Sequence, residues 1–137
     1  MKKIHKTTLL LAALLTIGFT SCTDDDKTVT PDIPPVEFTF NQPEAGKMYG
    51  KGDTVYINGT LSWENELHGY EITLTNVSAD STVFSAHGHE DAHTIYIDKL
   101  WVNNVTAHSD MKLTINALTD HEGAKESKEI MFHCHPM

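Results

Sequence analysis

Apolar and polar residues alternate along most of the chain after residue 35, in short runs that have the two-residue period of half-buried β-strands. The clearest run spans residues 110–118, where every second residue is apolar: Met111, Leu113, Ile115 and Ala117. The other predicted strands are residues 36–40, 53–61, 68–75, 82–87, 93–98 and 127–134. No stretch after residue 35 has helical periodicity. About seven short strands separated by turn residues predict an all-β fold, an antiparallel β-sandwich.

The same alternation predicts the core, because neighbouring residues of a strand face opposite sides of the sheet. The predicted interior consists of Ile57, Ile72, Leu74, Ile95, Met111, Leu113, Ile115, Ile130 and Phe132. Two stretches do not continue the alternation, and we expect them to be connections. Residues 62–67 form a polar loop around Trp63, and residues 100–109 form a longer connection with Trp101 and Val105.

The first 21 residues have the plan of a secretory signal. Three lysines within the first six residues are followed by an apolar run at residues 9–17, which is too short to span a bilayer as a helix. Residues 22–35 are acidic and then rich in threonine and proline, which predicts an extended tether. The remaining residues, 36–137, are one domain's worth of chain.

The segment Phe19-Thr20-Ser21-Cys22 resembles the lipobox of bacterial lipoproteins, although it lacks the usual leading leucine. The acidic residues Asp24–Asp26 that follow resemble those of Bacteroidetes-type surface lipoproteins. This resemblance implies that Cys22 carries the lipid and that the protein is anchored in the outer membrane, exposed on the cell surface. The alternatives are anchoring at the periplasmic face, or plain secretion with an unmodified Cys22.

A second resemblance concerns the domain itself. Pro43-x-x-Gly46 followed by residues 52–57 is similar to the opening of bacterial immunoglobulin-like domains. Taken whole, residues 36–135 resemble small His-rich, immunoglobulin-like lipoproteins. This likeness implies an immunoglobulin-like sandwich and a location, and it implies no activity.

The charge of the chain limits its partners. Without residues 1–21 the chain keeps seven basic and all nineteen acidic residues, a formal charge of −12 with histidine neutral. Such a domain repels nucleic acid and attracts cations. The sequence also lacks a nucleophile elbow, a phosphate-binding glycine loop and an HExxH motif, so we do not expect an enzyme.

The chemistry of the chain is concentrated in residues 87–93, which hold three histidines and two carboxylates: His87, His89, His93, Glu90 and Asp91. Neutral imidazole is the commonest side-chain metal ligand. If the strands alternate in direction, the turns after the second, fourth and sixth strands meet at one end. That arrangement adds His68 and His121, and the five histidines form a candidate site for zinc or copper.

The C-terminus offers a second candidate site, made of His133, His135 and, from the long connection, His108. His133-Cys134-His135 resembles the His-Cys-His of copper oxidases, but alternation turns Cys134 inward, opposite the two imidazoles. Apart from Cys22, Cys134 is the only cysteine, so no disulfide framework or CxxC zinc pattern exists.

We therefore expect a membrane-anchored binding protein that holds a transition metal through a His-rich end. The alternative is a structural or adhesive module, or an accessory to glycan capture, whose histidines are ordinary turn residues. Its partners would then be a protein or a glycan.

Overall fold

The computed structural model describes residues 32–137, which belong to one compact unit. The predicted signal at 1–21, the lipidated Cys22 and most of the predicted tether at 22–35 lie outside the described residues. No helix of the described part is long and apolar enough to cross a membrane.

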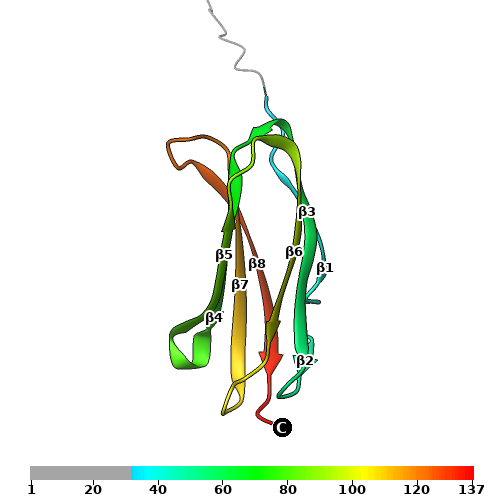
Figure 1. The fold of residues 1–137 in the computed structure, drawn as a ribbon, viewed down its shortest axis with the longest axis vertical. Coiled ribbons are helices and arrows are strands. Elements are labelled where there is room, and N and C mark those ends of the chain that lie inside the picture. Colours follow the sequence, from blue (N-terminus) through cyan, green and yellow to red (C-terminus); the bar gives the residue numbers. More distant parts are fainter. Residues whose placement is uncertain (1–31) are drawn as a thin grey trace, which may run out of the picture. The chain divides into compact units, whose positions relative to one another are not determined.

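Strands make up most of residues 32–137, as Figure 1 shows. In chain order they are β1 (Glu37–Gln42), β2 (Met48–Tyr49), β3 (Thr54–Leu67), β4 (Gly69–Asn76), β5 (Ser81–Gly88), β6 (Ala92–Val102), β7 (Ser109–Leu118) and β8 (Lys125–Cys134). A single 3-10 turn, η1 (Val77–Ala79), joins β4 to β5. The prediction of an all-β chain is confirmed.

The strands form two sheets that pack face to face. One sheet has the order β1-β3-β6, and the other has the order β2-β8-β7-β4-β5. All neighbours are antiparallel except the two-residue β2, which pairs in parallel with β8. Strands β1, β3 and β6 thus lie in one sheet and β4, β5, β7 and β8 in the other, so the chain crosses repeatedly between the sheets. These are the connections of an immunoglobulin-like sandwich, and the predicted fold class is confirmed.

Three details of the strand prediction were wrong. Residues 62–67 are the end of β3 and not a loop: Ser62 pairs with Thr94, and Leu67 pairs with Ala92 after a shift of register. The irregular pairing removes the alternation that would have marked a strand. Residues 100–102 are likewise the end of β6. The two-residue β2 was not predicted, since it is too short to have a period.

The core lies between the two sheets, and its composition follows the alternation. All nine side chains predicted to face inward are buried, and those of Leu74, Ile95, Met111, Leu113, Ile115 and Phe132 are fully inaccessible. Trp101, Val105 and Cys134 are also buried. The interior therefore continues to the last residues of β8.

The two ends of the sandwich carry different connections (Figure 1). The β3–β4, β5–β6 and β7–β8 turns lie at one end, which we call the turn pole. The other end, which we call the terminal pole, holds η1, the β6–β7 connection, β2 and the end of β8. Both poles carry histidines, and the two groups are separated by the length of the strands.

Candidate metal centre

Strand register brings the three turns of the turn pole together. Tyr70 of β4 pairs with Gly88 of β5, while Gly69 pairs with Leu118 of β7. The backbone N–H of His68 also donates to the carbonyl oxygen of Leu118, 2.8 Å away. His68 therefore lies between the turn that follows β5 and the turn that follows β7.

Two glycines permit this close approach. Gly69 has φ +131°, and a Cβ there would lie 2.3 Å from the carbonyl oxygen of Gly88. A Cβ on Gly88 would in turn lie 2.4 Å from the ring of Tyr70. Only glycine gives this backbone conformation and this contact without strain. Because Gly69 follows His68, the backbone beside His68 can lie against the β5–β6 turn.

Three imidazoles and one carboxylate meet there, and we call this group the turn-pole cluster: His68, His89, His121 and Asp91. The ring centroids of His68 and His121 are 4.0 Å apart, and those of His89 and His121 are 6.0 Å apart. One ligand atom from each of His68, Asp91 and His121 can be chosen so that all three lie within 4.8 Å of one another.

Hydrogen bonds orient two of the imidazoles in the way that metal-binding histidines are oriented. Nδ1 of His68 lies 2.8 Å from Oδ1 of Asp91, and Nδ1 of His89 lies 2.8 Å from the carbonyl oxygen of His68. A carbonyl only accepts, so Nδ1 of His89 carries the hydrogen and Nε2 keeps the lone pair. Donation of Nδ1–H to a carboxylate or carbonyl is the usual support of a metal ligand.

The carboxylate of Asp91 is held in its charged form. The hydrogen bond from His68, with the nearby imidazoles of His121 and His89, lowers the pKa of Asp91 below its ordinary value. A negative charge that persists at acidic pH favours a cation at this position. The cluster therefore combines imidazole nitrogens with one carboxylate whose pKa is lowered.

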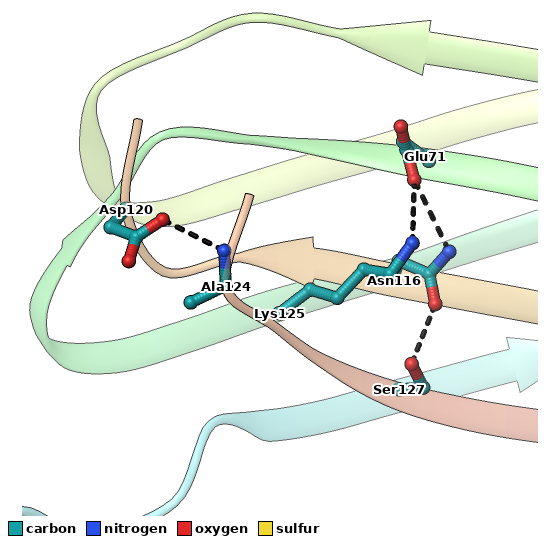
Figure 2. A network of polar contacts seen from close by, with 6 residues as sticks. All are labelled: Glu71, Asn116, Asp120, Ala124, Lys125 and Ser127. Atoms are coloured by element: carbon teal, nitrogen blue, oxygen red, sulfur yellow. Dashed lines mark hydrogen bonds and ion pairs between the residues drawn. The ribbon is translucent and has the colours of Figure 1, made fainter. Parts of the chain in front are cut away.

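The β7–β8 turn that carries His121 is fixed by its own aspartate. One oxygen of Asp120 accepts from the backbone N–H groups of Glu122 and Ala124, both at 2.8 Å. These backbone hydrogen bonds, with that of Ala124 first, lower the pKa of Asp120. Figure 2 shows the Asp120–Ala124 contact at the end of this turn.

Beside that turn, a polar network on the outer face ties β4, β7 and β8 together (Figure 2). Glu71 accepts from Lys125 at 3.3 Å and from Asn116 at 3.4 Å, and Asn116 accepts from Ser127 at 2.6 Å. The network anchors the strands on both sides of the turn. His121 consequently projects from a supported base.

The geometry of the cluster suits an imidazole-binding metal. Zinc–nitrogen bonds of about 2.0 Å and tetrahedral angles place the ring centroids of two ligating imidazoles about 5 Å apart. The rings of His68 and His121, at 4.0 Å, would need to separate by only about 1 Å. Nitrogen and carboxylate donors together fit zinc, and nitrogen donors also fit copper.

The other two histidines predicted for this site lie apart from the cluster. His87 lies on β5, where it pairs with Glu71 of β4. Together with neighbouring residues of both strands it lines a shallow surface hollow of 260 Å³. Nδ1 of His93 donates to the carbonyl oxygen of Asn65, 3.0 Å away. Neither belongs to the group that meets within 4.8 Å. Asp91, which the prediction named only as a neighbouring acid, does belong to it.

The histidines of the second predicted site all lie at the terminal pole. The rings of His108 and His135 are in contact, with centroids 4.3 Å apart. Nδ1 of His133 lies 2.8 Å from Oδ1 of Asp110, its pairing partner on β7. Cys134, which stands between His133 and His135 in the sequence, is buried on the inward side, as alternation predicted.

The fold and the cluster define an immunoglobulin-like β-sandwich with histidines gathered on the turns of one pole. Neither a protein-family model nor a curated protein matches the chain. Among solved structures it is similar to the fibronectin(III)-like modules of Clostridium thermocellum CbhA, at 15% sequence identity and a TM-score of 0.44. The match covers 74% of this chain and 98% of that chain. A likeness at this level says nothing about activity or ligands.

Proposed function

We propose that the protein is a membrane-anchored binding lipoprotein whose turn-pole cluster holds a transition-metal ion, zinc or copper. One observation carries the proposal: His68, Asp91 and His121, from three different turns, offer ligand atoms within 4.8 Å of one another. Residues from three turns meet in this way only when the whole fold forms. Solvated turn histidines need no such convergence.

The surroundings of the cluster support the same proposal. Nδ1 of His68 and Nδ1 of His89 are both engaged by oxygen acceptors, which leaves both Nε2 atoms for a metal. The formal charge of the chain is −9 with histidine neutral, which attracts cations to the surface. His89 is the candidate fourth ligand, because its ring centroid lies 6.0 Å from that of His121.

Metal titration of the purified protein tests the proposal. The protein is prepared in mild detergent without a polyhistidine tag, and zinc and copper are titrated by calorimetry at pH 7.5 and pH 5.5. We expect binding at pH 7.5 that weakens at pH 5.5, because protons compete for imidazole nitrogens through the usual histidine range near about 6.5. Metal should also raise the melting temperature at the higher pH.

Two variants separate the cluster from other histidines. His68→Gln/His121→Gln should lose one equivalent of metal, while His87→Gln, a histidine of β5 outside the cluster, should keep it. Circular dichroism checks that both variants fold. Equal binding by the wild type and the double variant would overturn the proposal for this pole.

The anchor is proposed from the sequence, since Cys22 follows a charged and then apolar leader. Cys22→Ala should release the protein from membranes, as measured by fractionation after a carbonate wash. External protease on intact cells should cleave the wild type if it is displayed at the surface. Full protection would instead favour the periplasmic face, and a Cys22→Ala variant that stays on the membrane would contradict lipid anchoring.

A second candidate function, capture of a glycan, is favoured by the outer face of the three-stranded sheet. Tyr96 is 80% exposed there, and Tyr56 and Leu100, which pair across β3 and β6, are about half exposed. Between the two tyrosines, Asn58 donates to Asp98 at 2.7 Å. Two exposed rings with a polar pair between them can stack on sugars and hydrogen-bond to them.

Affinity electrophoresis in gels that contain soluble polysaccharides tests this candidate. Tyr56→Ala/Tyr96→Ala should abolish any retardation, whereas Thr73→Ala on the other sheet should not. Retardation that is absent in the wild type, or unchanged in the tyrosine variant, would remove glycan capture from this face.

A further inference from the structure

The terminal pole contains an open cavity of 340 Å³. Its lining comes from four parts of the chain: β2, η1, the β6–β7 connection with the start of β7, and the end of β8. Six of the lining residues are of types that can bind metals: His108, His133, His135, Met48, Asp110 and Cys134. This group is separate from the turn-pole cluster and shares no residue with it.

One imidazole in the cavity lacks a partner. Nε2 of His135 is buried and has no hydrogen-bond partner among the described residues. Buried polar atoms are almost always paired, so an unpaired one needs an explanation, and a bound ion would supply a partner. The ring of His108 lies against that of His135, with centroids 4.3 Å apart and planes at 86°.

The backbone that carries both histidines is rigidly held by Asn103, whose side chain is 1% exposed. Its amide Nδ2 donates to the carbonyl oxygens of Tyr49, Gly50 and His135, at 3.1, 2.8 and 3.2 Å. Its Oδ1 accepts from the backbone N–H of Val105 at 3.1 Å. One buried side chain thus fixes the end of β8 and the start of the connection that leads to His108.

The other end of the connection is fixed as well. Ser109 donates to the carbonyl oxygen of Ala107 at 3.0 Å and accepts from the buried Asn76 at 3.0 Å. The backbone N–H of His135 donates to the carbonyl oxygen of Tyr49 at 2.9 Å. Such support by buried hydrogen bonds is what holds metal ligands in a productive geometry.

Two neighbouring residues lie outside this pair. The side chain of His133 lies on the outer face of its sheet, 47% exposed, and takes no part in the ring contact between His108 and His135. Cys134 is 1% exposed and belongs to the apolar core with Ile130 and Phe132, so it forms an apolar wall of the cavity.

We infer that His108 and His135 form a second transition-metal site, at the terminal pole. Nitrogen sites of this kind bind divalent copper more tightly than zinc, so copper is the expected ion. Two imidazoles on one ion have centroids about 5 Å apart, so the observed pair needs only a small opening. The site does not depend on the function proposed for the turn pole.

Copper binding in a protein that lacks the turn-pole ligands tests this inference. In the His68→Gln/His121→Gln background, prepared in detergent without a tag, we expect one equivalent of copper to remain bound. Adding His108→Ala or His135→Gln should lower its affinity at least tenfold. His133→Gln is the matched control and should leave the affinity unchanged. Copper should bind more tightly than zinc.

Several outcomes would overturn the inference. One is a background variant that binds no copper, and another is copper binding that survives both His108→Ala and His135→Gln. A loss of copper affinity in His133→Gln equal to that in the two test variants would also contradict it. In the otherwise wild-type protein, His108→Ala should remove one equivalent whether or not the turn pole binds metal. The two proposals therefore fail separately. Magnetic resonance of the imidazole protons adds a second readout, since copper should perturb His108 and His135 and leave His87 unchanged.

Discussion

At the scale of single residues, four of the histidines are oriented by the group that their Nδ1 meets. In His68 and His133 that group is a carboxylate, and in His89 and His93 it is a backbone carbonyl. All four bonds leave Nε2 as the atom that can accept a proton or a metal. Among the described residues, only the turn-pole cluster brings ligand atoms from three turns within 4.8 Å of one another, and these are two imidazole nitrogens and one carboxylate oxygen.

Asp120 leads to a prediction about acid stability. Its pKa is lowered by backbone hydrogen bonds, above all from Ala124, so its folded value lies below the unfolded value of about 3.9. The stabilisation is therefore complete above the unfolded value and is lost as pH falls through the folded one. Asp120→Asn should flatten the fall in melting temperature between pH 5 and pH 3. Asp80→Asn controls for the loss of one charge, and an identical fall in wild type and Asp120→Asn would contradict the assignment.

Cys134 leads to a prediction about reactivity. Burial raises the pKa of its thiol to about 11, so almost no thiolate exists at pH 8. Iodoacetamide should leave Cys134 unmodified in the folded protein and alkylate it fully in denaturant, as measured by mass spectrometry of the C-terminal peptide. Fast labelling of the native protein would mean that the end of β8 opens readily.

At the scale of elements, the turns do more than connect strands. The β3–β4 turn is tight because Gly69 adopts a positive φ, and the backbone of Gly69 lies close to that of Gly88 at the end of β5. The β7–β8 turn is closed by Asp120 and by the Thr119–Ala124 backbone hydrogen bond of 2.9 Å. The geometry of three turns, each joining a different pair of strands, therefore brings the residues of the candidate metal centre together.

Gly69→Ala should disturb this passage more than a comparable substitution elsewhere. The new Cβ would lie 2.3 Å from a backbone oxygen, and the φ of +131° is strained for alanine. Gly123→Ala is the matched control, since its φ is +100° and its Cβ would meet nothing within 4 Å. The control should lose about 1–3 kcal/mol of unfolding free energy, and Gly69→Ala should lose more. Equal losses in a urea titration would mean that the close contact with Gly88 is unimportant.

At the scale of the whole molecule, a single core holds both poles in place. The inward residues of β7 occupy its centre, and Ile115 pairs with Ile72 while being fully buried. The poles lie at opposite ends of the same strands, so both depend on this core. Loss of packing at the centre should weaken both ends together.

Truncation of Ile115 tests the position of the core. Ile115→Ala should lower the free energy of unfolding by about 2–5 kcal/mol, because it leaves a cavity in a closed interior. Thr114→Ala, one residue away on the outer face, should cost less than about 1 kcal/mol. Chemical denaturation of both variants measures the difference, and similar losses would contradict the assigned strand phase.

How far the sequence alone predicts the fold is clearest on β7 and β3. On β7 the alternation from Met111 to Ala117 predicted the strand, its phase and its buried face, because one face of a sheet must leave water. On β3 the same logic failed after Ser62, where the register shifts and polar residues interrupt the period. Periodicity cannot predict a strand whose pairing is irregular.

For the candidate site, the sequence by itself determined which residue types are present and which turns they occupy. The conclusion that His68 and His121 share an end with residues 87–93 needed only the alternating direction of the strands. The tertiary structure decided which of these side chains meet. His87 and His89 are two residues apart, yet one lies on the face of the sheet and the other reaches the carbonyl of His68. The strand ends between them, and alternation no longer applies beyond its end.

The terminal pole follows the same division. The alternation of β8 determined that Cys134 is buried, since it continues the inward series of Ile130 and Phe132. It did not determine that His135 leaves the outward series of His133 and turns toward His108. That depends on Tyr49 and Asn103, far away in the chain, which bind the backbone of His135. Contacts between distant segments have no period in the sequence, so only the folded structure decides them.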